Sequence, residues 1–187
     1  MGKKVSFIEQ MEHSECGLAS LAMVFKYHGK YVSLAELREK FGVPKGGTSL
    51  YQLMIIGSYY DMDVKGFKVT KEALLDMPLP LIIHWENKHY VVLESITKRQ
   101  VTIVDPALGR RKISHQEFDE KFTGYTLRLL PTESFTKSKG PSHVKFFLSF
   151  ALSKPKLVFL IIFGSLILQL FTLLVPWLTT WITDNVI

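Results

Sequence analysis

The single cysteine of this chain, Cys16, precedes a run of residues with helical periodicity, so its thiol stands at the start of a predicted helix. A thiol at that position lies near the unpaired backbone N–H groups of the first turn and the positive end of the helix dipole, and both stabilise a thiolate. Because the thiolate is the attacking form, Cys16 is a candidate nucleophile. Taken alone, a cysteine at a helix start is more often inert packing.

Three further residues could complete the chemistry of acyl transfer. Gln10 lies six residues before Cys16, and its amide could join the Cys16 backbone N–H in an oxyanion hole. His89 begins a predicted strand, and Asp105 ends a later one sixteen residues on. The two ends of an antiparallel hairpin meet at one edge of a sheet, where Asp105 would orient the imidazole and stabilise the imidazolium. Helix-borne cysteine facing sheet-borne histidine and aspartate is the layout of papain-like peptidases.

The other histidines are weaker candidates. His84 lies in the same predicted sheet and is the alternative to His89, but a structural role is the favoured interpretation. The remaining histidines show no spacing typical of metal ligands, so solvated or capping roles are expected for them: His13, His28, His115 and His143. A single cysteine also excludes an internal disulfide and a multi-cysteine metal site. We therefore expect neither a metal nor another cofactor in this domain.

The elements that must position these residues are helices first and strands afterwards. Capping signals and periodicity predict three helices: residues 15–28 after Ser14, a helix from Ser33 to a stop at Gly42 with Glu36 in a capping box, and one after Ser49 with Gln52 in the same role. Strands rich in β-branched and aromatic residues follow: residues 64–70, 81–85, 89–96, 101–105 and 125–130, with turns at 86–88 and 98–100 and a short helix after Ser114 capped with Glu117. This order predicts an α+β fold with helices packed on an antiparallel sheet.

A glycine pair precedes the third helix. Gly46-Gly47-Thr48 could suggest phosphate binding at a helix start, but no G-x-x-x-x-G-K-[ST] motif occurs in the chain. A turn is the favoured interpretation.

Residues 157–183 contain no charged residue and no histidine. About 20 apolar residues span a bilayer, so this run predicts a transmembrane helix, and a buried helix of a soluble protein is the less favoured alternative. Five lysines precede the run: Lys137, Lys139, Lys145, Lys154 and Lys156. Only Asp184 follows it among charged residues, so the N-terminal side is expected in the cytosol, as the unpaired thiol also indicates. The basic cluster, within a net charge of +6, therefore points to a membrane and not to nucleic acid.

The segment between the globular part and the apolar run changes composition. Residues 131–141 are rich in Ser, Thr, Lys and Gly, which is typical of a linker. Residues 144–152 carry aromatic and aliphatic side chains between lysines, which predicts an interfacial helix, or else a helix that packs on the preceding domain. The predicted organisation is a peptidase domain over 1–131, a linker and interfacial helix over 132–153, and a transmembrane helix over 154–187.

Three blocks of sequence resemble the C39 peptidases: QMEHSECGLA at residues 10–19 with YHG at 27–29, HYVVL at 89–93, and DPALG at 105–109. They occur in the family's order and cover most of residues 7–130. The resemblance implies that Cys16 is the nucleophile, His89 the general base, Asp105 its orienting partner and Gln10 the oxyanion donor. The chain departs from the family pattern at none of these positions.

The resemblance also implies a function. In that family the domain is fused to the N-terminus of an ABC exporter of bacteriocins or lanthipeptides, and residues 174–187 resemble the end of the first exporter helix. The resemblance therefore implies that this chain removes double-glycine leader peptides on the cytosolic side of a bacterial cell membrane. The full-length protein is expected to cross the membrane several times and to form a homodimer. ATP would act only in an exporter portion expected beyond residue 187. Alternatives are a docking domain without catalysis, disfavoured by intact Cys16, His89 and Asp105, and a tail-anchored peptidase, disfavoured by the exporter-like tail.

The leader is expected to dock through apolar residues of its own helix in a groove on the peptidase. Weak candidates for that groove are Tyr51, Met54 and Tyr59 on the third predicted helix. Aromatic and methionine stripes at helical spacing are usually core, and we favour that interpretation for these three residues.

Overall fold

The structure is a computed structural model that describes residues 3–140, 149 and 152–186. The chain divides into two compact units, Met1–Gly140 and Pro141–Ile187. The predicted interfacial helix over 144–152 lies outside the described residues except at its positions 149 and 152. Each unit is described here by itself.

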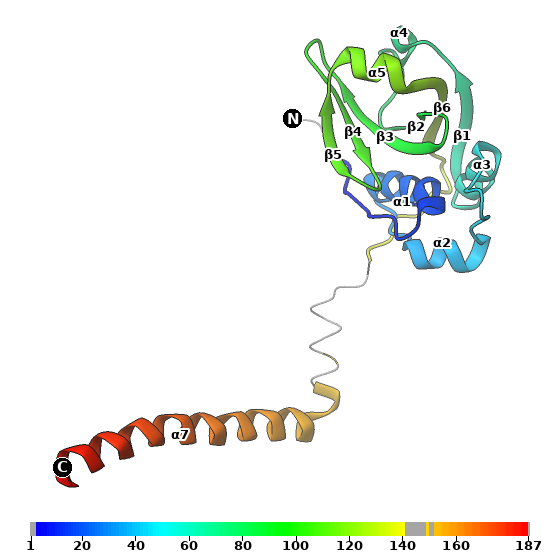
Figure 1. Cartoon of the computed structure of the whole chain (residues 1–187). Coiled ribbons are helices and arrows are strands. Elements are labelled where there is room, and N and C mark those ends of the chain that lie inside the picture. The colour runs from blue at the N-terminus through cyan, green and yellow to red at the C-terminus, as the bar shows by residue number, and fades with distance from the viewer. Residues whose placement is uncertain (1–2, 141–148, 150–151, 187) are drawn as a thin grey trace. The chain divides into compact units, whose positions relative to one another are not determined.

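The first unit combines helices with one antiparallel sheet (Figure 1). Its helical elements are η1 His13–Glu15, α1 Cys16–His28, α2 Leu34–Phe41, α3 Leu50–Tyr59, α4 Lys71–Leu74 and α5 His115–Lys121. Its strands are β1 Met62–Lys68, β2 Leu81–Trp85, β3 His89–Ile96, β4 Val101–Asp105, β5 Gly109–Ile113 and β6 Phe122–Pro131. The strand order is β1-β6-β2-β3-β4-β5, and every neighbouring pair is antiparallel. The predicted α+β fold is confirmed.

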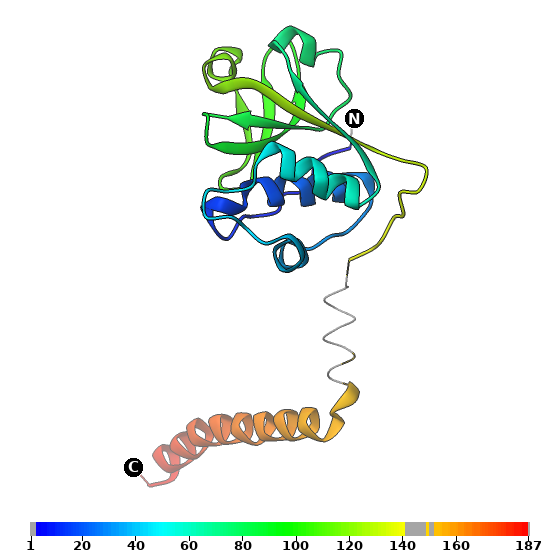
Figure 2. The same cartoon turned by 90° about the vertical axis from the view of Figure 1, so that its right-hand side faces the viewer.

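The two faces of the sheet bury separate hydrophobic clusters because successive side chains along a strand point to opposite faces. Along β2, Ile82 joins the cluster that contains α1, whereas Ile83 joins the cluster that contains Phe118 of α5. Figure 2 shows α1 and α3 together against one side of the sheet. The sheet is thus a middle layer with α1 and α3 on one face and the short helices α4 and α5 on the other.

Helix α1 is the central element of the first cluster. Its residues from Cys16 to Phe25 are all buried, which is typical of a core helix that is apolar on every side. The helix ends at His28, and its C-cap residue Gly29 has φ of 99° and donates its N–H to the last turn. The prediction that Ser14 caps this helix is wrong. The N-cap is Glu15, which belongs to a preceding 3₁₀ turn, and a Glu12–Glu15 capping box closes that turn instead.

The other capping predictions have mixed outcomes. Ser49 and Gln52 form the predicted capping box of α3. Ser33 and Ser114 accept the expected backbone hydrogen bonds, at 3.1 and 3.0 Å. The glutamate side chains that follow them bond elsewhere: Glu36 accepts from the Tyr60 hydroxyl at 2.8 Å, and Glu117 pairs with Arg111 and Lys121.

Besides the 3₁₀ turn η1, two elements were missed by the sequence patterns. Strand β5 carries Arg110, Arg111 and Lys112 and lies at the edge of the sheet, where charged side chains protect against unwanted strand pairing. Its charge hides the alternation that signals a strand. Helix α4 has a single turn of four residues, which is too short to show helical periodicity.

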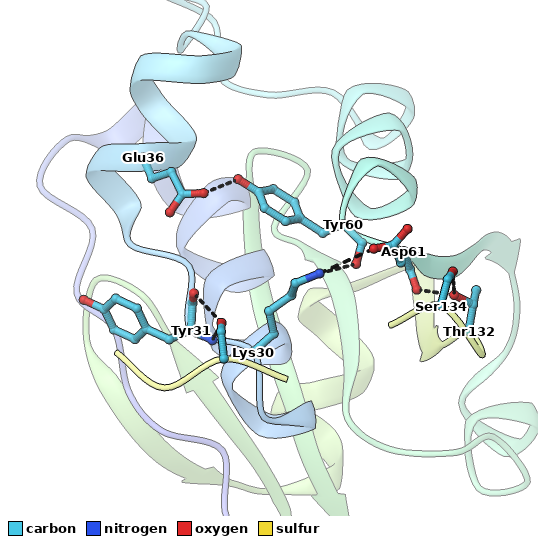
Figure 3. A network of polar contacts seen from close by, with 8 residues as sticks. Lys30, Tyr31, Glu36, Tyr60, Asp61, Thr132 and Ser134 are labelled. Atoms are coloured by element: carbon cyan, nitrogen blue, oxygen red, sulfur yellow. Dashed lines mark hydrogen bonds and ion pairs between the residues drawn. The ribbon is translucent and has the colours of Figure 1, made fainter. Parts of the chain in front are cut away.

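The segment after β6, residues 132–140, packs on the rest of the first unit (Figure 3). Ser138 donates its N–H to the Gly29 carbonyl at 3.1 Å and accepts at its own carbonyl from Tyr31 at 3.0 Å. Thr132 donates its N–H to the Asp61 carbonyl at 3.1 Å. The compact unit therefore continues to residue 140, nine residues past the predicted boundary at 131.

The second unit contains α7, Pro155–Val186. Within it, Pro155–Thr183 is a 29-residue span that contains an 18-residue window with a mean hydropathy of 2.6. By length and composition this helix is able to cross a membrane.

Candidate active site

Cys16 begins helix α1 and His89 begins strand β3, and the fold brings the start of the helix close to the start of the strand. Cys16 is the first residue of α1 and is 4% exposed. His89 is the first residue of β3, directly after the hairpin turn whose Glu86 and Asn87 have positive φ of 51° and 58°. Both side chains line one cleft, and Cys16 lies near enough to His89 to raise the pKa of its imidazole.

Gly17 permits the close approach of α1 to its neighbours. A Cβ atom at this position would lie 3.0 Å from a methyl carbon of Leu53 on α3 and 3.3 Å from the Tyr90 ring on β3. Such contacts are tighter than ordinary van der Waals packing, so a larger residue would push α1 away from the sheet. The glycine after the cysteine therefore helps to hold the sulfur near His89.

Asp105 orients the His89 ring. Its Oδ1 atom lies 2.8 Å from His89 Nε2 and also accepts the Ala107 N–H at 2.8 Å. The pairing of Val92 with Val104 in β3 and β4 carries the two side chains to the same edge of the sheet. With Nε2 bound to the carboxylate, Nδ1 is the ring nitrogen left for the Cys16 sulfur.

The charges of this group support one another. Burial lowers the pKa of His89, but hydrogen bonds and charge interactions with Asp105 and Cys16 outweigh burial and raise this pKa to about 9. Burial raises the pKa of Asp105, but the hydrogen bonds from His89 and Ala107 outweigh it and hold this pKa below its usual range. At neutral pH the pair is an imidazolium and a carboxylate.

Gln10 lies in the same cleft as Cys16 and His89, because the residues before the first helix are hydrogen-bonded to the sheet and to the turn after β4. Val5 donates its N–H to Glu94 at 2.6 Å, and Gln10 donates its N–H to the Pro106 carbonyl at 3.0 Å. The Gln10 Oε1 atom is buried and has no hydrogen-bond partner among the described residues. The amide is thus held at the site by its backbone and not by bonds to its oxygen.

A cleft of about 740 Å³ runs past these side chains. Gln10, Cys16, His89 and Asp105 line it together with the turn at residues 45–49. The interpretation of Gly46-Gly47-Thr48 as a turn is confirmed, because Gly47 has φ of 84° and donates its N–H to the Pro44 carbonyl at 2.8 Å. The cleft is large enough to admit an extended peptide segment, and the cysteine lies on its wall.

His84 also lines the cleft, but its ring bonds to another residue than Asp105. Its Nδ1 lies 2.9 Å from the Thr123 hydroxyl, and its ring packs on Tyr90 with centroids 5.2 Å apart. Burial and the charge of His89 both lower its pKa. These contacts agree with a structural role. His143 lies outside the described residues, and within the described part of the chain no three His, Cys, Asp or Glu side chains gather as a metal site.

The two tyrosines that were expected to lie in the core, Tyr51 and Tyr59 of α3, lie on the surface instead. Tyr51 and Tyr59 are 71% and 55% exposed, so that interpretation is wrong for both. Met54 is partly buried and packs on the core as expected. Ile55, 49% exposed, extends the apolar surface of α3. The periodicity failed here because it identifies an apolar face without showing what covers that face.

Comparison with known proteins identifies the class of this site. Residues 4–134 match the family described as Peptidase C39. Because this match covers more than half of the chain, the chain belongs to the Peptidase C39 family, and the predicted resemblance is confirmed. Its class is therefore that of the cysteine peptidases.

The relatives of this chain include processing transporters. A lacticin-481/lactococcin-DR transport/processing ATP-binding protein of Lactococcus lactis subsp. lactis is 32% identical over 90% of this chain and 25% of its own length. A probable microcin-H47 secretion/processing ATP-binding protein of Escherichia coli is 35% identical over 71% of this chain and 19% of its own length. The chain thus spans about a quarter or less of these relatives.

Solved structures show the same fold. A double glycine motif protease from an AMS/PCAT transporter, in complex with its leader peptide, has a TM-score of 0.67 and 40% identity, and the match covers 70% of this chain and 94% of that one. The peptidase domain of Streptococcus ComA, a bifunctional ABC transporter, has a TM-score of 0.64 and 26% identity, with 70% and 100% covered.

The raised pKa of His89 is open to direct measurement. Because the pKa in the folded chain, about 9, exceeds the ordinary value of 6.5, protonation stabilises the fold below pH 6.5, and that stabilisation is lost as pH rises through about 9. NMR titration of ¹⁵N-labelled histidines should place His89 near pH 9. In Asp105→Asn it should fall to roughly 7–8, while His84 scarcely moves. An imidazole at His89 that titrates near 6.5 in the unchanged chain would contradict this.

Proposed function

We propose that this chain is a papain-like cysteine endopeptidase that removes double-glycine leader peptides from bacteriocin or lanthipeptide precursors. The observation that carries the proposal is the contact of Cys16, His89 and Asp105 in one cleft, with Gln10 beside them. The substrate class is supported by the processing transporters among the relatives and by the related protease bound to its leader peptide. In this proposal the chain is the N-terminal part of an ABC exporter that works as a homodimer.

The proposed reaction needs only side chains of this chain. The Cys16 thiolate attacks the carbonyl carbon of the scissile amide, and the new C–S bond places the displaced electron pair on the carbonyl oxygen. The Gln10 amide and the Cys16 backbone N–H stabilise that oxyanion. As the C–N bond breaks, the His89 imidazolium gives its proton to the leaving amine. The product is a thioester of the leader.

Hydrolysis of the thioester returns the enzyme to its starting state. Neutral His89 takes a proton from water, and the hydroxide attacks the thioester carbonyl. The second tetrahedral intermediate expels the Cys16 thiolate and releases the leader as a carboxylate. The imidazolium is restored beside the thiolate. No cofactor enters this scheme, and ATP would act only in an exporter portion.

We propose that the exposed face of α3 binds the leader helix. Tyr51, Ile55 and Tyr59 give this face an apolar surface, and an amphipathic helix docks on such a surface through residues spaced three and four apart. Affinity would then come from the leader, while the cleft selects small residues at the two positions before the scissile bond.

The catalytic assignment predicts graded losses of activity. Cys16→Ala should abolish cleavage of a precursor while leader binding persists, and His89→Ala should come close to the same loss. Gln10→Ala should lower kcat by roughly 10²–10³, and Asp105→Asn should have a large but milder effect than His89→Ala. His84→Ala is the matched histidine control and should stay active. Rates are measured with the full chain in detergent and a leader–cargo substrate.

Two outcomes would overturn that assignment. Near wild-type cleavage by Cys16→Ala would exclude it as the nucleophile. Activity with His89→Ala and none with His84→Ala would show that the other histidine is the base. An intact chain that binds leader but never cleaves it would favour the alternative of a non-catalytic docking domain.

We also propose that the peptidase domain faces the cytosol of a bacterial cell. Lysines such as Lys154 and Lys156 precede the apolar run, and Lys and Arg concentrate on the cytoplasmic side of membrane helices. A membrane-impermeant maleimide should therefore label Cys16 in inside-out vesicles and spare it in right-side-out vesicles. Because Cys16 is buried, His-tag accessibility at the N-terminus serves as the control. The reverse labelling pattern would overturn this topology.

The substrate proposal predicts that specificity and affinity separate. Replacing the final glycine of the leader with Val should remove cleavage and leave binding measurable, because a side chain displaces the scissile carbonyl from attack geometry. Replacing apolar leader residues with polar ones should weaken binding itself, as should Tyr51→Ser with Tyr59→Ser in the enzyme. Lys65→Ser, on the exposed part of β1, is the control. Efficient cutting of the Val peptide would sink the double-glycine proposal even if Cys16 is catalytic.

A further inference from the structure

The carboxylate of Glu15 is buried directly before the cysteine. Its side chain is 1% exposed, and both of its oxygens are engaged. Oε1 accepts from Arg38 Nε at 2.6 Å, and Oε2 accepts the backbone N–H groups of Met11 at 3.0 Å and Glu12 at 3.2 Å. A buried carboxylate is costly unless it is paired and hydrogen-bonded, and this one meets both conditions.

These contacts close the loop that runs from Gln10 to Cys16. Met11 follows Gln10 and Glu15 precedes Cys16, so one carboxylate ties the two ends of the loop to each other. On its other side, Gln10 is held through its own N–H by the Pro106 carbonyl. The backbone at Gln10 is therefore fixed on both sides. Its own N–H bonds to Pro106 in the turn after β4, and the N–H of the next residue, Met11, bonds to Glu15.

Arg38 connects this loop to the rigid part of the fold. It lies on α2, whose first turn is capped by Ser33 and whose end is set by Gly42. The guanidinium also contacts the Met11 sulfur at 3.5 Å. Its charge balances the buried carboxylate, and its helix gives the loop a fixed reference point.

We propose that Glu15, paired with Arg38, is the positioning residue of the oxyanion hole. Neither side chain touches the substrate. Glu15 sets the distance between the Gln10 amide and the Cys16 backbone N–H, which must both point at one oxygen for the hole to work. Small displacements of such donors are costly in rate, which explains why a charged group is buried at this place. This inference rests on the proposed peptidase function.

The test compares Glu15→Gln and Gln10→Ala, alone and combined, in the full 187-residue chain in detergent. Glutamine keeps the shape of Glu15, but its amide presents a donor or a weaker acceptor to Arg38 and the backbone. We expect kcat to fall about 10²-fold, with KM within about twofold. In the Gln10→Ala background the same change should lower kcat by about twofold at most, because the group it positions is already gone.

Two further measurements separate positioning from general stability. The affinity of a leader-derived peptide aldehyde, whose adduct carries the tetrahedral oxygen, should fall with kcat, while alkylation of Cys16 by iodoacetamide keeps its rate. Asp63→Asn is the matched control, because it removes a carboxylate that pairs with Arg128 at 3.1 Å elsewhere in the sheet. It should leave kcat unchanged.

Several results would overturn the inference. One is an equal loss of kcat from Glu15→Gln with and without Gln10; another is an unchanged kcat in the single variant. If Glu15→Gln does not fold, Arg38→Lys keeps the charge but moves the donor, and the same dependence on Gln10 must hold for it. A failure of the proposed peptidase function would look different. In that case the unchanged chain would not cleave the leader–cargo substrate, or the Cys16→Ala variant would still cleave it.

Discussion

Burial of α1 against the centre of the sheet determines where Cys16 lies in this protein. Ten consecutive residues, from Cys16 to Phe25, are buried, and burial of apolar surface is the main favourable term in folding. A helix held on all sides cannot rotate or slide without losing those contacts. Its first residue therefore has a fixed position relative to β3, where His89 begins. Cys16 and His89 meet because two elements pack, with Gly17 setting how closely.

Electrostatic interactions then stabilise His89 and Asp105 as a charged pair at this position. Three ionisable groups lie close together at Cys16, His89 and Asp105, in surroundings that disfavour charge. Hydrogen bonding outweighs burial for both His89 and Asp105, so each stabilises the charged form of the other. Glu15 follows the same rule one residue away from the cysteine, where Arg38 and two backbone N–H groups outweigh burial and lower its pKa. The site is thus a small set of compensated charges within an apolar frame.

The first unit completes its own core and also includes the segment that follows its last strand. Phe135 packs on the main cluster, and Lys30 lies 4.9 Å above its ring. Together with the Ser138 and Thr132 hydrogen bonds, these contacts make residues 132–140 part of the folded domain. The exposed apolar surface of α3 is a contrasting feature, because Tyr51 and Tyr59 lie outside the core and are available to a partner.

Local sequence was sufficient for much of this protein. Capping residues and β-branched runs predicted α2, β2, β3, β4 and the start of α3 within a residue or so, because those signals act over a few neighbours. Strand β5 was not predictable in this way, because its charged side chains hide the alternation that signals a strand. The extent of the domain to residue 140 was not predictable either, since Thr132 and Ser138 are held by partners distant in sequence. The family motifs pointed to Cys16, His89, Asp105 and Gln10, and spacing alone had already suggested that His89 and Asp105 meet.

Only the tertiary structure decided which atoms face one another. It showed that Nε2 of His89 binds Asp105, and that His84 turns to Thr123 instead. It also showed that Glu15, which no local pattern marked, bonds to Arg38 and to the backbone after Gln10. The sequence by itself determined the order and type of most elements and the residues able to do chemistry. Contacts between distant residues depend on how elements pack, and packing is a property of the whole fold and not of any window of sequence.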